Sequence, residues 1–363
     1  MKDQEKNLVS RRRFIATAAA ATAVFSIPPI RTGGVNSTEP VSNSTPSTKF
    51  NSKFGGVQMG LITYAFRSYK DKSAVKILQY CVDAGIGSIE YMGGPAEVYA
   101  GIPSGTPADA ETIKKNIGGK STSRPLDFSK SMIGDGGGWG SYPGNEEQRK
   151  WRASVPMTKF EELRKIYNNA GVEIHIVKIS PATWSDEEID YAFRMGKALG
   201  AKCLTDELDW VEGAVPRLAS FAEKHSMYAG FHVHQQFGSE GFSVDPYLAI
   251  SPAVVLSFDA GHYYGATGLN PCGFIEKYHD RIFNIHLKDK TGPNTDPPNT
   301  NQVWGQGETP LQDVLLLMKE HAGEKNWPKY IDIELEYPVQ KWSDPVKEVR
   351  KCLNYAKFIL SCE

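Results

Sequence analysis

Five short segments of the chain carry side chains that can bind a metal ion, each set into an otherwise strand-like run. In order they are residues 204–207 (LTDE), 231–234 (FHVH), 257–262 (SFDAGH), 284–289 (NIHLKD) and 333–336 (IELE). Histidine with carboxylate is a ligand set for divalent cations of borderline to hard character. One such segment would mean little, whereas five separated by helical stretches are hard to attribute to packing. The pattern predicts a metal site built from consecutive strands.

Strand alternation indicates which of these side chains share a face. It places His286 and Lys288 on one side of their strand and Leu287 on the other. An inward-facing histidine or lysine needs a partner, because an unpaired buried polar group is costly. A metal ion for His286 and a substrate oxygen for Lys288 would serve. A salt bridge from Lys288 to a neighbouring carboxylate is the alternative.

Two other strands each present a pair of such side chains, His232 with His234 and Glu334 with Glu336. We expect one member of each pair to bind the metal. The other member would orient a ligand, as metal-bound histidine usually requires, or contact the substrate.

Asp259 ends its strand, and His262 follows three residues later. A helix cap is the alternative role for Asp259 and for Glu207, which we favour over Asp206 as the inward-facing acid of its strand. Asp259 and His286 are expected metal ligands, Glu207 is a further candidate, and one member of each of the two pairs would complete the set. The expected catalytic residues are Glu334, Glu207, Lys288 and His262. Substrate contacts are expected from His234, His262, Lys288, Glu336 and Trp304.

Strand-like and helix-like patterns alternate from residue 57 onward. Strands are expected at residues 57–66, 88–92, 172–179, 202–207, 229–235, 254–259, 282–288 and 330–336. Eight strand–helix units in roughly 300 residues are typical of a (β/α)8 TIM barrel, whose functional residues gather at the carboxyl ends of the strands. A doubly wound open sheet is the alternative, weakened because no GxGxxG follows the first strand.

Residues 93–157 interrupt this rhythm. They are rich in Gly, Pro and Ser and predict a long loop insertion after strand two, of a kind that is usually functional or disordered. Farther along, Thr158 with Glu161 and Ser185 with Glu188 match the capping box that opens a helix.

Bulk composition bounds the class of protein. The 363 residues, 40% of them hydrophobic, are enough for one large domain. The net charge of −1 gives no broad attraction to nucleic acid or anionic lipid. Five cysteines without a CxxC imply neither a disulfide framework nor a thiolate zinc site.

The first thirty residues differ from the rest. Residues 10–13 (SRRR) precede an alanine-rich apolar run at 16–27, which predicts a twin-arginine export signal over residues 1–30 and a periplasmic location. An amphipathic or disordered N-terminus is the alternative. The run is too short to span a bilayer comfortably, so we expect no stable membrane span after signal removal. Residues 31–53 are expected to form a flexible linker, and residues 54–363 the catalytic barrel.

The segments together resemble the xylose isomerase-like barrel superfamily, the sugar phosphate isomerase/epimerase group that includes D-tagatose 3-epimerase. Residues 259–262 (DAGH) resemble the D-x-G-H segment of this group, residues 286–289 match its H-L-K-D segment, and residues 333–336 resemble its last-strand glutamate. The resemblance covers roughly residues 57–360.

The resemblance implies metal-binding roles for Asp259, His286 and Glu334. The remaining metal-binding glutamate of the epimerases falls on His232. This departure suggests that Glu207, on the neighbouring strand, supplies the missing carboxylate.

The resemblance further implies an enzyme that removes a proton next to a metal-bound carbonyl, with Mn, Mg, Co or Zn as the cofactor. The departure at His232 puts a two-glutamate epimerase mechanism in doubt, so a 3-keto-glycoside lyase or hydratase on the same metal site is an alternative. An exported non-catalytic carbohydrate-binding barrel is the alternative of another class.

The expected partner is a small-molecule sugar, keto-sugar or glycoside. A non-phosphorylated substrate is favoured because sugar phosphates are cytoplasmic and because residues 305–307 (GQG), the only candidate phosphate cradle, look like a turn. The superfamily also includes endonuclease IV, but residues 88–94 lack the histidine that its site needs, and no nucleic-acid partner is expected. The sequence is also compatible with a homo-oligomer.

Overall fold

The structure is a computed structural model that describes residues 51–126 and 142–362. The predicted export signal (residues 1–30) and nearly all of the predicted linker (residues 31–53) lie outside this part of the chain. Within it, Lys53 already belongs to a short strand, β1 (Lys53–Phe54), which is antiparallel to the first barrel strand. None of the described helices is long and apolar enough to cross a membrane.

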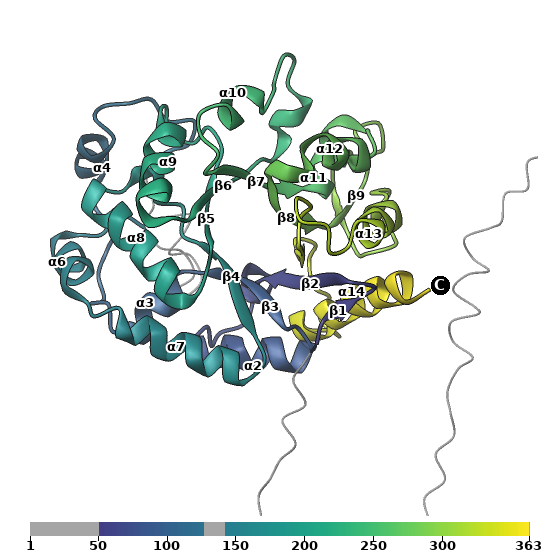
Figure 1. Cartoon of the computed structure of the whole chain (residues 1–363), viewed down its shortest axis with the longest axis horizontal. Coiled ribbons are helices and arrows are strands. Elements are labelled where there is room, and N and C mark those ends of the chain that lie inside the picture. Colours follow the sequence, from purple (N-terminus) through teal and green to yellow (C-terminus); the bar gives the residue numbers. More distant parts are fainter. Residues whose placement is uncertain (1–50, 127–141, 363) are drawn as a thin grey trace, which may run out of the picture. The chain divides into compact units, whose positions relative to one another are not determined.

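Eight parallel strands form a closed barrel (Figure 1), and this confirms the predicted (β/α)8 fold. The order around the barrel is β2-β11-β8-β7-β6-β5-β4-β3, and the pairing of β2 with β3 closes it. The strands are β2 (Val57–Ile62), β3 (Ser88–Met92), β4 (Glu173–Lys178), β5 (Cys203–Glu207), β6 (Tyr228–His232), β7 (Val254–Asp259), β8 (Ile282–Leu287) and β11 (Tyr330–Ile333).

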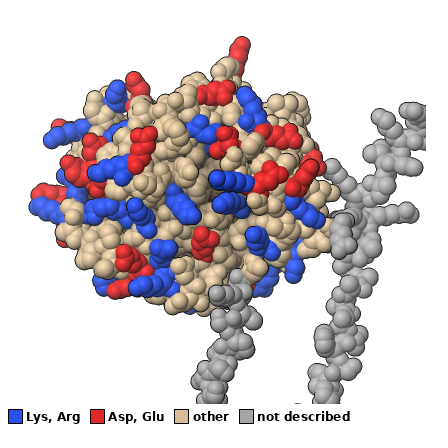
Figure 2. All heavy atoms as spheres, viewed as in Figure 1, with Lys and Arg blue, Asp and Glu red and all other residues tan. Residues whose placement is uncertain are grey.

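Helices surround the strands (Figure 1). They are α2 (Ala74–Ala84), α3 (Gly94–Ala100), α4 (Ala110–Asn116), α6 (Glu146–Ser154), α7 (Thr158–Asn169), α8 (Asp186–Leu199), α9 (Ala214–His225), α10 (Asp245–Leu248), α11 (Ala260–Thr267), α12 (Pro271–Tyr278), α13 (Leu311–Glu320) and α14 (Pro345–Ser361). Basic and acidic side chains are interspersed on the face seen in Figure 2, as the near-zero net charge leads one to expect.

Side chains alternate between the helical layer and the barrel interior. Residues such as Tyr91, Phe231 and Leu287 are fully buried in the main hydrophobic core. The interior, by contrast, is largely polar on one side. Asn284 donates hydrogen bonds to Asp332 (2.7 Å) and to Glu90 (3.3 Å), both of which have no exposed surface. The barrel therefore holds a buried polar network below its mouth.

A glycine makes room for this network. Gly60 on β2 pairs in register with Asp332 on β11, and a Cβ atom at Gly60 would lie 2.1 Å from Asp332 Oδ1 and 3.1 Å from the Ser88 carbonyl oxygen. Any side chain at position 60 would therefore collide with the interior carboxylate.

Several local expectations need correction. The predicted long loop at residues 93–157 contains three helices, α3, α4 and α6, within its described part. Ser185 and Glu188 form the predicted capping box of α8, whereas Thr158 lies inside α7, whose N-cap is Met157 without a side-chain cap. Strands β6 and β11 end earlier than predicted, so that His234, Glu334 and Glu336 follow their strands instead of closing them.

Candidate active site

Four of the five expected metal ligands meet at the carboxyl ends of neighbouring strands. One nitrogen or oxygen atom from each of four side chains lies within 4.8 Å of the others, and all four residues are buried. We call these residues the four-residue cluster: His232, Asp259, His286 and Glu334. The sheet register explains the meeting, because Asp259 pairs with His286, and His286 with Asp332, two residues before the glutamate.

Each member of the cluster has a buried atom without a well-directed hydrogen bond from any described residue. These atoms are His232 Nδ1, Asp259 Oδ2, His286 Nδ1 and Glu334 Oε2. Three of them lie in close ion pairs instead: Glu334 Oε2 is 3.0 Å from His286 Nδ1, and Lys288 Nζ is 2.8 Å from Asp259 Oδ2 and 2.9 Å from Glu334 Oε2. Two imidazole nitrogens and two carboxylate oxygens are the donor set of a borderline-to-hard divalent cation. The residues present therefore fit a divalent metal ion.

The two oxygens of Asp259 have different partners. Oδ1 accepts a hydrogen bond from the backbone N–H of His262 (2.7 Å), which caps helix α11 directly after β7. Oδ2 faces the cluster. The helix-cap and metal-ligand roles, which the sequence sets as alternatives, are thus compatible, and the cap fixes the orientation of the carboxylate.

His286 is held by a carboxylate on the far side of its ring. Its Nε2 lies 2.5 Å from Glu90 Oε2, and Glu90 Oε1 accepts a further hydrogen bond from Thr205 (2.7 Å). Burial alone would lower the pKa of His286, but Glu90 and Glu334 outweigh it and raise that pKa well above the usual value. A carboxylate behind a histidine is the usual arrangement for a metal ligand, because it fixes the ring and the tautomer.

Lys288 Nζ lies among three carboxylates. It is 2.8 Å from Asp259 Oδ2, 2.9 Å from Glu334 Oε2 and 2.7 Å from Glu336 Oε2. Only the contact with Glu336 has hydrogen-bond geometry, so the first two are close ion pairs. Burial would lower the pKa of Lys288, but the carboxylates raise it above its usual value. Lys288 is therefore the cation that these three carboxylates share.

The pKa values of the two cluster carboxylates shift in opposite directions, although burial favours a rise in both. Burial raises the pKa of Asp259, although Lys288 opposes it. Burial would also raise the pKa of Glu334, but Lys288 and His286 hold it well below the usual value. Glu334 is thus ionised and paired, which suits a ligand better than a proton acceptor.

The structure does not bring Glu207, the fifth expected ligand, to this cluster. Glu207 Oε1 accepts a hydrogen bond from Lys178 Nζ (2.6 Å), and Oε2 lies 3.3 Å from His234 Nδ1 and 3.6 Å from Arg124. Burial would raise the pKa of Glu207, but Lys178 lowers it to about 2. The strand-end lysine on β4, a cross-strand neighbour that the segment pattern did not include, takes the place expected for a metal ion.

The other expected substrate contacts fall in different places. His262 Nε2 lies 3.6 Å from Glu336 Oε2, and neither ring nitrogen has a hydrogen bond from a described residue. His234 is partly exposed, and its ring lies edge-on to that of His232, with the two ring centroids 4.4 Å apart. Trp304 is a correction: it is buried, packs edge-on against Tyr355, and does not line the described cavity beside the cluster.

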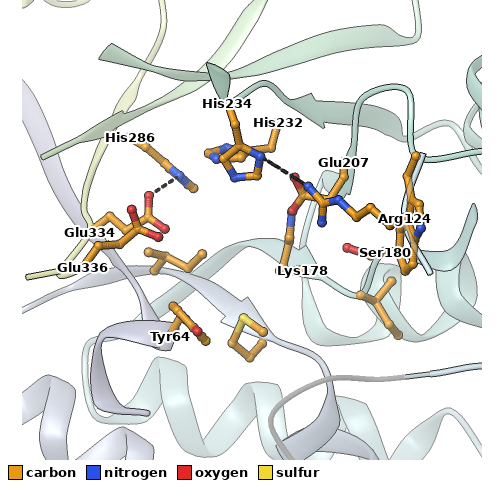
Figure 3. Close-up of a pocket in the computed structure, with 14 residues that line it drawn as sticks. Tyr64, Arg124, Lys178, Ser180, Glu207, His232, His234, His286, Glu334 and Glu336 are labelled. Carbon is orange, nitrogen blue, oxygen red and sulfur yellow. Dashed lines mark hydrogen bonds and ion pairs between the residues drawn. The ribbon is translucent and has the colours of Figure 1, made fainter. Parts of the chain in front are cut away.

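A cavity of about 260 Å³ lies between the two groups of side chains (Figure 3). Glu334 and Glu336 lie on one side of this inner cavity, and Lys178 and Glu207 on the other. An open groove of about 770 Å³ adjoins it. The inner cavity and the outer groove share three lining residues: Arg124, His234 and Glu336.

Sequence reasoning missed three charged residues of the site: Glu90, Lys178 and Arg124. Glu90 lies in a short strand, SIEYM, that looks apolar, and its signal was a carboxylate at an inward position of a buried strand. Lys178 closes β4 in the same way. Inward position at a strand end was the informative criterion, and it applies to lysine as well as to metal ligands.

No protein-family model matches the sequence, and no curated protein matches it. Several solved structures, in contrast, are similar to this chain. A sugar phosphate isomerase/epimerase from Parabacteroides distasonis is 15% identical, with 87% of this chain and 97% of that chain covered and a TM-score of 0.51. A xylose isomerase domain protein from Alicyclobacillus acidocaldarius is 12% identical, with coverage of 84% and 100% and a TM-score of 0.53. The chain has the fold of the xylose isomerase-like barrels. D-Psicose 3-epimerase from Clostridium cellulolyticum is also similar, at 10% identity, coverage of 84% and 100%, and a TM-score of 0.52.

These similarities extend over nearly the whole barrel and confirm the fold that the sequence segments predicted. Among the xylose isomerase-like barrels, D-psicose 3-epimerase acts on a sugar, as its name says. At these identities the likeness establishes the fold of this chain, and its function is argued from the site.

Proposed function

We propose that the protein is a divalent-metal-dependent sugar isomerase or epimerase that removes a proton from the carbon next to the carbonyl of a non-phosphorylated sugar. The observation that carries the proposal is the convergence of four buried side chains at the mouth of the barrel, each with one nitrogen or oxygen ligand atom within 4.8 Å of the others. When bound there, a divalent cation would stabilise the negative charge that develops on the carbonyl oxygen as the proton leaves.

Glu336 is assigned as the proton acceptor. It lines the inner cavity beside the cluster without belonging to it, and its side chain is 24% exposed. Glu334 is the less suitable base because Lys288 and His286 keep its pKa low. Lys288, hydrogen-bonded to Glu336 at 2.7 Å, is placed to hold that carboxylate. It does not line the inner cavity, so we do not assign it the substrate contact that the sequence predicts. His262, 3.6 Å from the same carboxylate, lines the adjoining groove as a second contact.

A lyase or hydratase acting on keto-glycosides is the second candidate. The observation that favours it is the outer groove, which shares the lining residues Arg124, His234 and Glu336 with the inner cavity. A glycoside could place its ketone-bearing ring in the cavity and its second unit in the groove. Removal of the same proton would then be followed by loss of the group on the neighbouring carbon.

The test is solvent proton exchange into a panel of free ketoses and keto-glycosides, measured by NMR in deuterated buffer with Mn²⁺ and after chelation. Metal-dependent exchange without bond cleavage supports the isomerase, and exchange with release of the aglycone supports the lyase. Metal-independent sugar binding without exchange would support the non-catalytic carbohydrate-binding barrel and sink the proposal.

Export by the twin-arginine route is proposed on the sequence alone. The motif at residues 10–13 and the apolar run that follows support it. Replacing Arg11, Arg12 and Arg13 by lysine should retain the protein in the cytoplasm of a host with this pathway, as fractionation would show. Periplasmic recovery of that variant would exclude the route.

A further inference from the structure

We propose that His232, His234 and His262 form a second metal site beside the four-residue cluster, and that this site takes a divalent cation of borderline character such as Zn²⁺. We call these three residues the histidine triad. The proposed function needs one ion, at the cluster, so the second site goes beyond that function and does not depend on it.

The three side chains converge from the ends of two neighbouring strands. His232 closes β6, His234 follows two residues later, and His262 lies in the first turn of α11, directly after β7. One ligand atom from each lies within 4.8 Å of the other two. Figure 3 shows His232 and His234 side by side. Three imidazoles are a known donor set for zinc.

The three rings meet edge-on. Their centroids are 4.4 Å apart for His232 and His234, 4.7 Å for His234 and His262, and 6.1 Å for His232 and His262. The interplanar angles are 74°, 87° and 77° in the same order. The rings are therefore not stacked on one another, and their contact is not a stacking interaction.

The unpaired nitrogens of His262 are an independent observation. This side chain is buried, and neither of its ring nitrogens has a hydrogen bond from a described residue. Carboxylate oxygens of Glu336 and Asp259 lie 3.6 and 3.8 Å from its Nε2, beyond hydrogen-bonding distance. His232 Nδ1 is likewise buried without a hydrogen bond from the described part of the chain. Buried polar groups are hydrogen-bonded in about nine cases out of ten or more, so these nitrogens call for a bound ligand.

His234 has the surroundings of a metal-bound histidine. Its Nδ1 lies 3.3 Å from Glu207 Oε2 and 3.4 Å from the Arg124 guanidinium, which leaves Nε2 to bind an ion. A carboxylate behind the imidazole is the usual partner of a metal-bound histidine. Lys178 in turn holds the other oxygen of Glu207, at 2.6 Å. Glu207 would thus orient a ligand of the second site.

The charges around the triad favour coordination by nitrogen over simple attraction of a cation. The neighbouring carboxylates are already paired with cationic side chains, in the contacts Glu207–Lys178, Glu207–Arg124, Asp259–Lys288 and Glu336–Lys288. Imidazole suits Zn²⁺, whereas Mn²⁺ and Mg²⁺ prefer carboxylate and water oxygens. The triad should therefore bind Zn²⁺ in preference to Mn²⁺, whereas the cluster, with two carboxylates, accepts either ion.

His232 belongs to both groups. A neutral imidazole has one nitrogen that can accept, so His232 serves one ion at a time. With an ion in the triad, the cluster keeps Asp259, His286 and Glu334, a set of one imidazole and two carboxylates that still suits a divalent cation. Both sites can then be filled together.

Direct contact with sugar hydroxyls is the competing explanation for His234 and His262. Both residues line the outer groove, and the sequence predicts both as substrate contacts. Three protein ligands leave a fourth position on a zinc ion for water or a substrate oxygen, so the triad could still contact a sugar through the ion. The two explanations differ in the absence of sugar, when only a metal site binds an ion.

The experiment is metal analysis of the full chain after dialysis against Zn²⁺ or Mn²⁺, followed by removal of loosely bound ions, with no sugar present. We expect about two Zn²⁺ per chain but about one Mn²⁺, because Mn²⁺ prefers the carboxylate-rich cluster. His262→Gln should lower the zinc content to about one and leave the manganese content unchanged. His234→Gln should do the same, and it gives the reading if the first variant fails to fold.

The matched control is a histidine that pairs with a carboxylate elsewhere. His321 Nδ1 lies 2.9 Å from Glu324 Oε1, and its side chain is partly exposed, like that of His234. His321→Gln should leave both metal contents unchanged. A single zinc ion in the wild-type protein, or a zinc content that does not fall in either triad variant, overturns the inference.

Failure of the proposed function would look different. A second zinc ion that is lost in the His262 variant, without any metal-dependent proton exchange by the wild-type protein, overturns the isomerase and supports the triad. Proton exchange by the Mn²⁺-loaded protein, with a single zinc ion after dialysis against Zn²⁺, does the reverse.

Discussion

His286 Nε2 lies 2.5 Å from Glu90 Oε2, inside the barrel and on the side of the imidazole that faces away from the other three cluster residues. The ring is therefore fixed before any ion binds, with Nδ1 3.0 Å from Glu334 Oε2 in the cluster. A buried carboxylate on β3 thus determines which nitrogen of a β8 histidine is available as a ligand.

Glu90→Gln tests this relationship. The amide removes the charged acceptor for the imidazole N–H, so we expect the affinity for Mn²⁺ to fall by about 10- to 100-fold, as is usual when the partner of a metal-bound histidine is lost. Competition with a fluorescent chelator measures the affinity. Asp190→Asn, which alters an Asp–His pair between helices (His225 Nε2–Asp190 Oδ1, 2.8 Å), is the control and should bind the ion normally. Equal affinities in all three proteins would show that Glu90 does not position the ligand.

Two glutamates on the same wall should separate metal binding from proton transfer. Glu334→Gln removes one of four ligand atoms, so both Mn²⁺ binding and solvent exchange should be lost. Glu336→Gln removes the proposed proton acceptor outside the cluster, so the ion should stay bound while exchange falls by roughly 10²–10⁴-fold, the usual contribution of a general base. Metal content and deuterium incorporation on the same samples decide this. Normal exchange in the Glu336 variant would return the role of base to Glu334.

The Lys178–Glu207 ion pair predicts a specific pH dependence of stability. Because Lys178 depresses the pKa of Glu207 to about 2 from 4.5, ionised Glu207 stabilises the fold above pH 4.5, and this contribution is lost as the pH falls toward 2. At 1.36 kcal/mol per pKa unit it amounts to about 3 kcal/mol.

Urea unfolding of wild type and Glu207→Gln across this range checks the sign and the size. The difference in free energy of unfolding should be largest near neutral pH and should shrink by about 3 kcal/mol toward acid. A difference that stays constant from pH 6 to pH 2 is incompatible with an ion pair at this position.

The polar interior predicts an unusually sensitive glycine. Gly60→Ala would place Cβ 2.1 Å from Asp332 Oδ1, so the free energy of unfolding should drop by about 1–3 kcal/mol, the usual cost of overpacking. Gly273→Ala on α12 is the control. Its Cβ would meet no heavy atom within 4 Å, and alanine there should be neutral or stabilising by up to about 1 kcal/mol. Thermal unfolding of the two variants tests the comparison; similar melting temperatures would argue against a packed polar interior.

Strand periodicity explains which residues of the site the sequence could predict. His232, Asp259 and His286 occupy inward positions of consecutive parallel strands, so order and alternation alone bring them together. Glu207 obeys the same rule, and its inward position was correctly anticipated. Its partner was not anticipated. Alternation along one strand does not show whether a metal ion or the side chain of Lys178, on the neighbouring strand, pairs with the carboxylate.

Other parts of the structure depend on contacts that periodicity does not encode. Glu90 carries no motif, and its role appears only when β3 and β8 lie across the barrel from each other. Trp304 looked like a mouth aromatic, yet it packs against Tyr355 on α14. Residues 93–157 contain short helices among many glycines and prolines, and propensity alone predicts a loop there.

The most direct test of the account is anomalous diffraction from crystals of the protein loaded with Mn²⁺. The account predicts one strong peak at about 2.0–2.5 Å, the range of metal–ligand distances, from one atom each of His232, Asp259, His286 and Glu334. A peak beside Glu207, a peak deeper in the barrel between Glu90 and Asp332, or no peak near the four residues would contradict it.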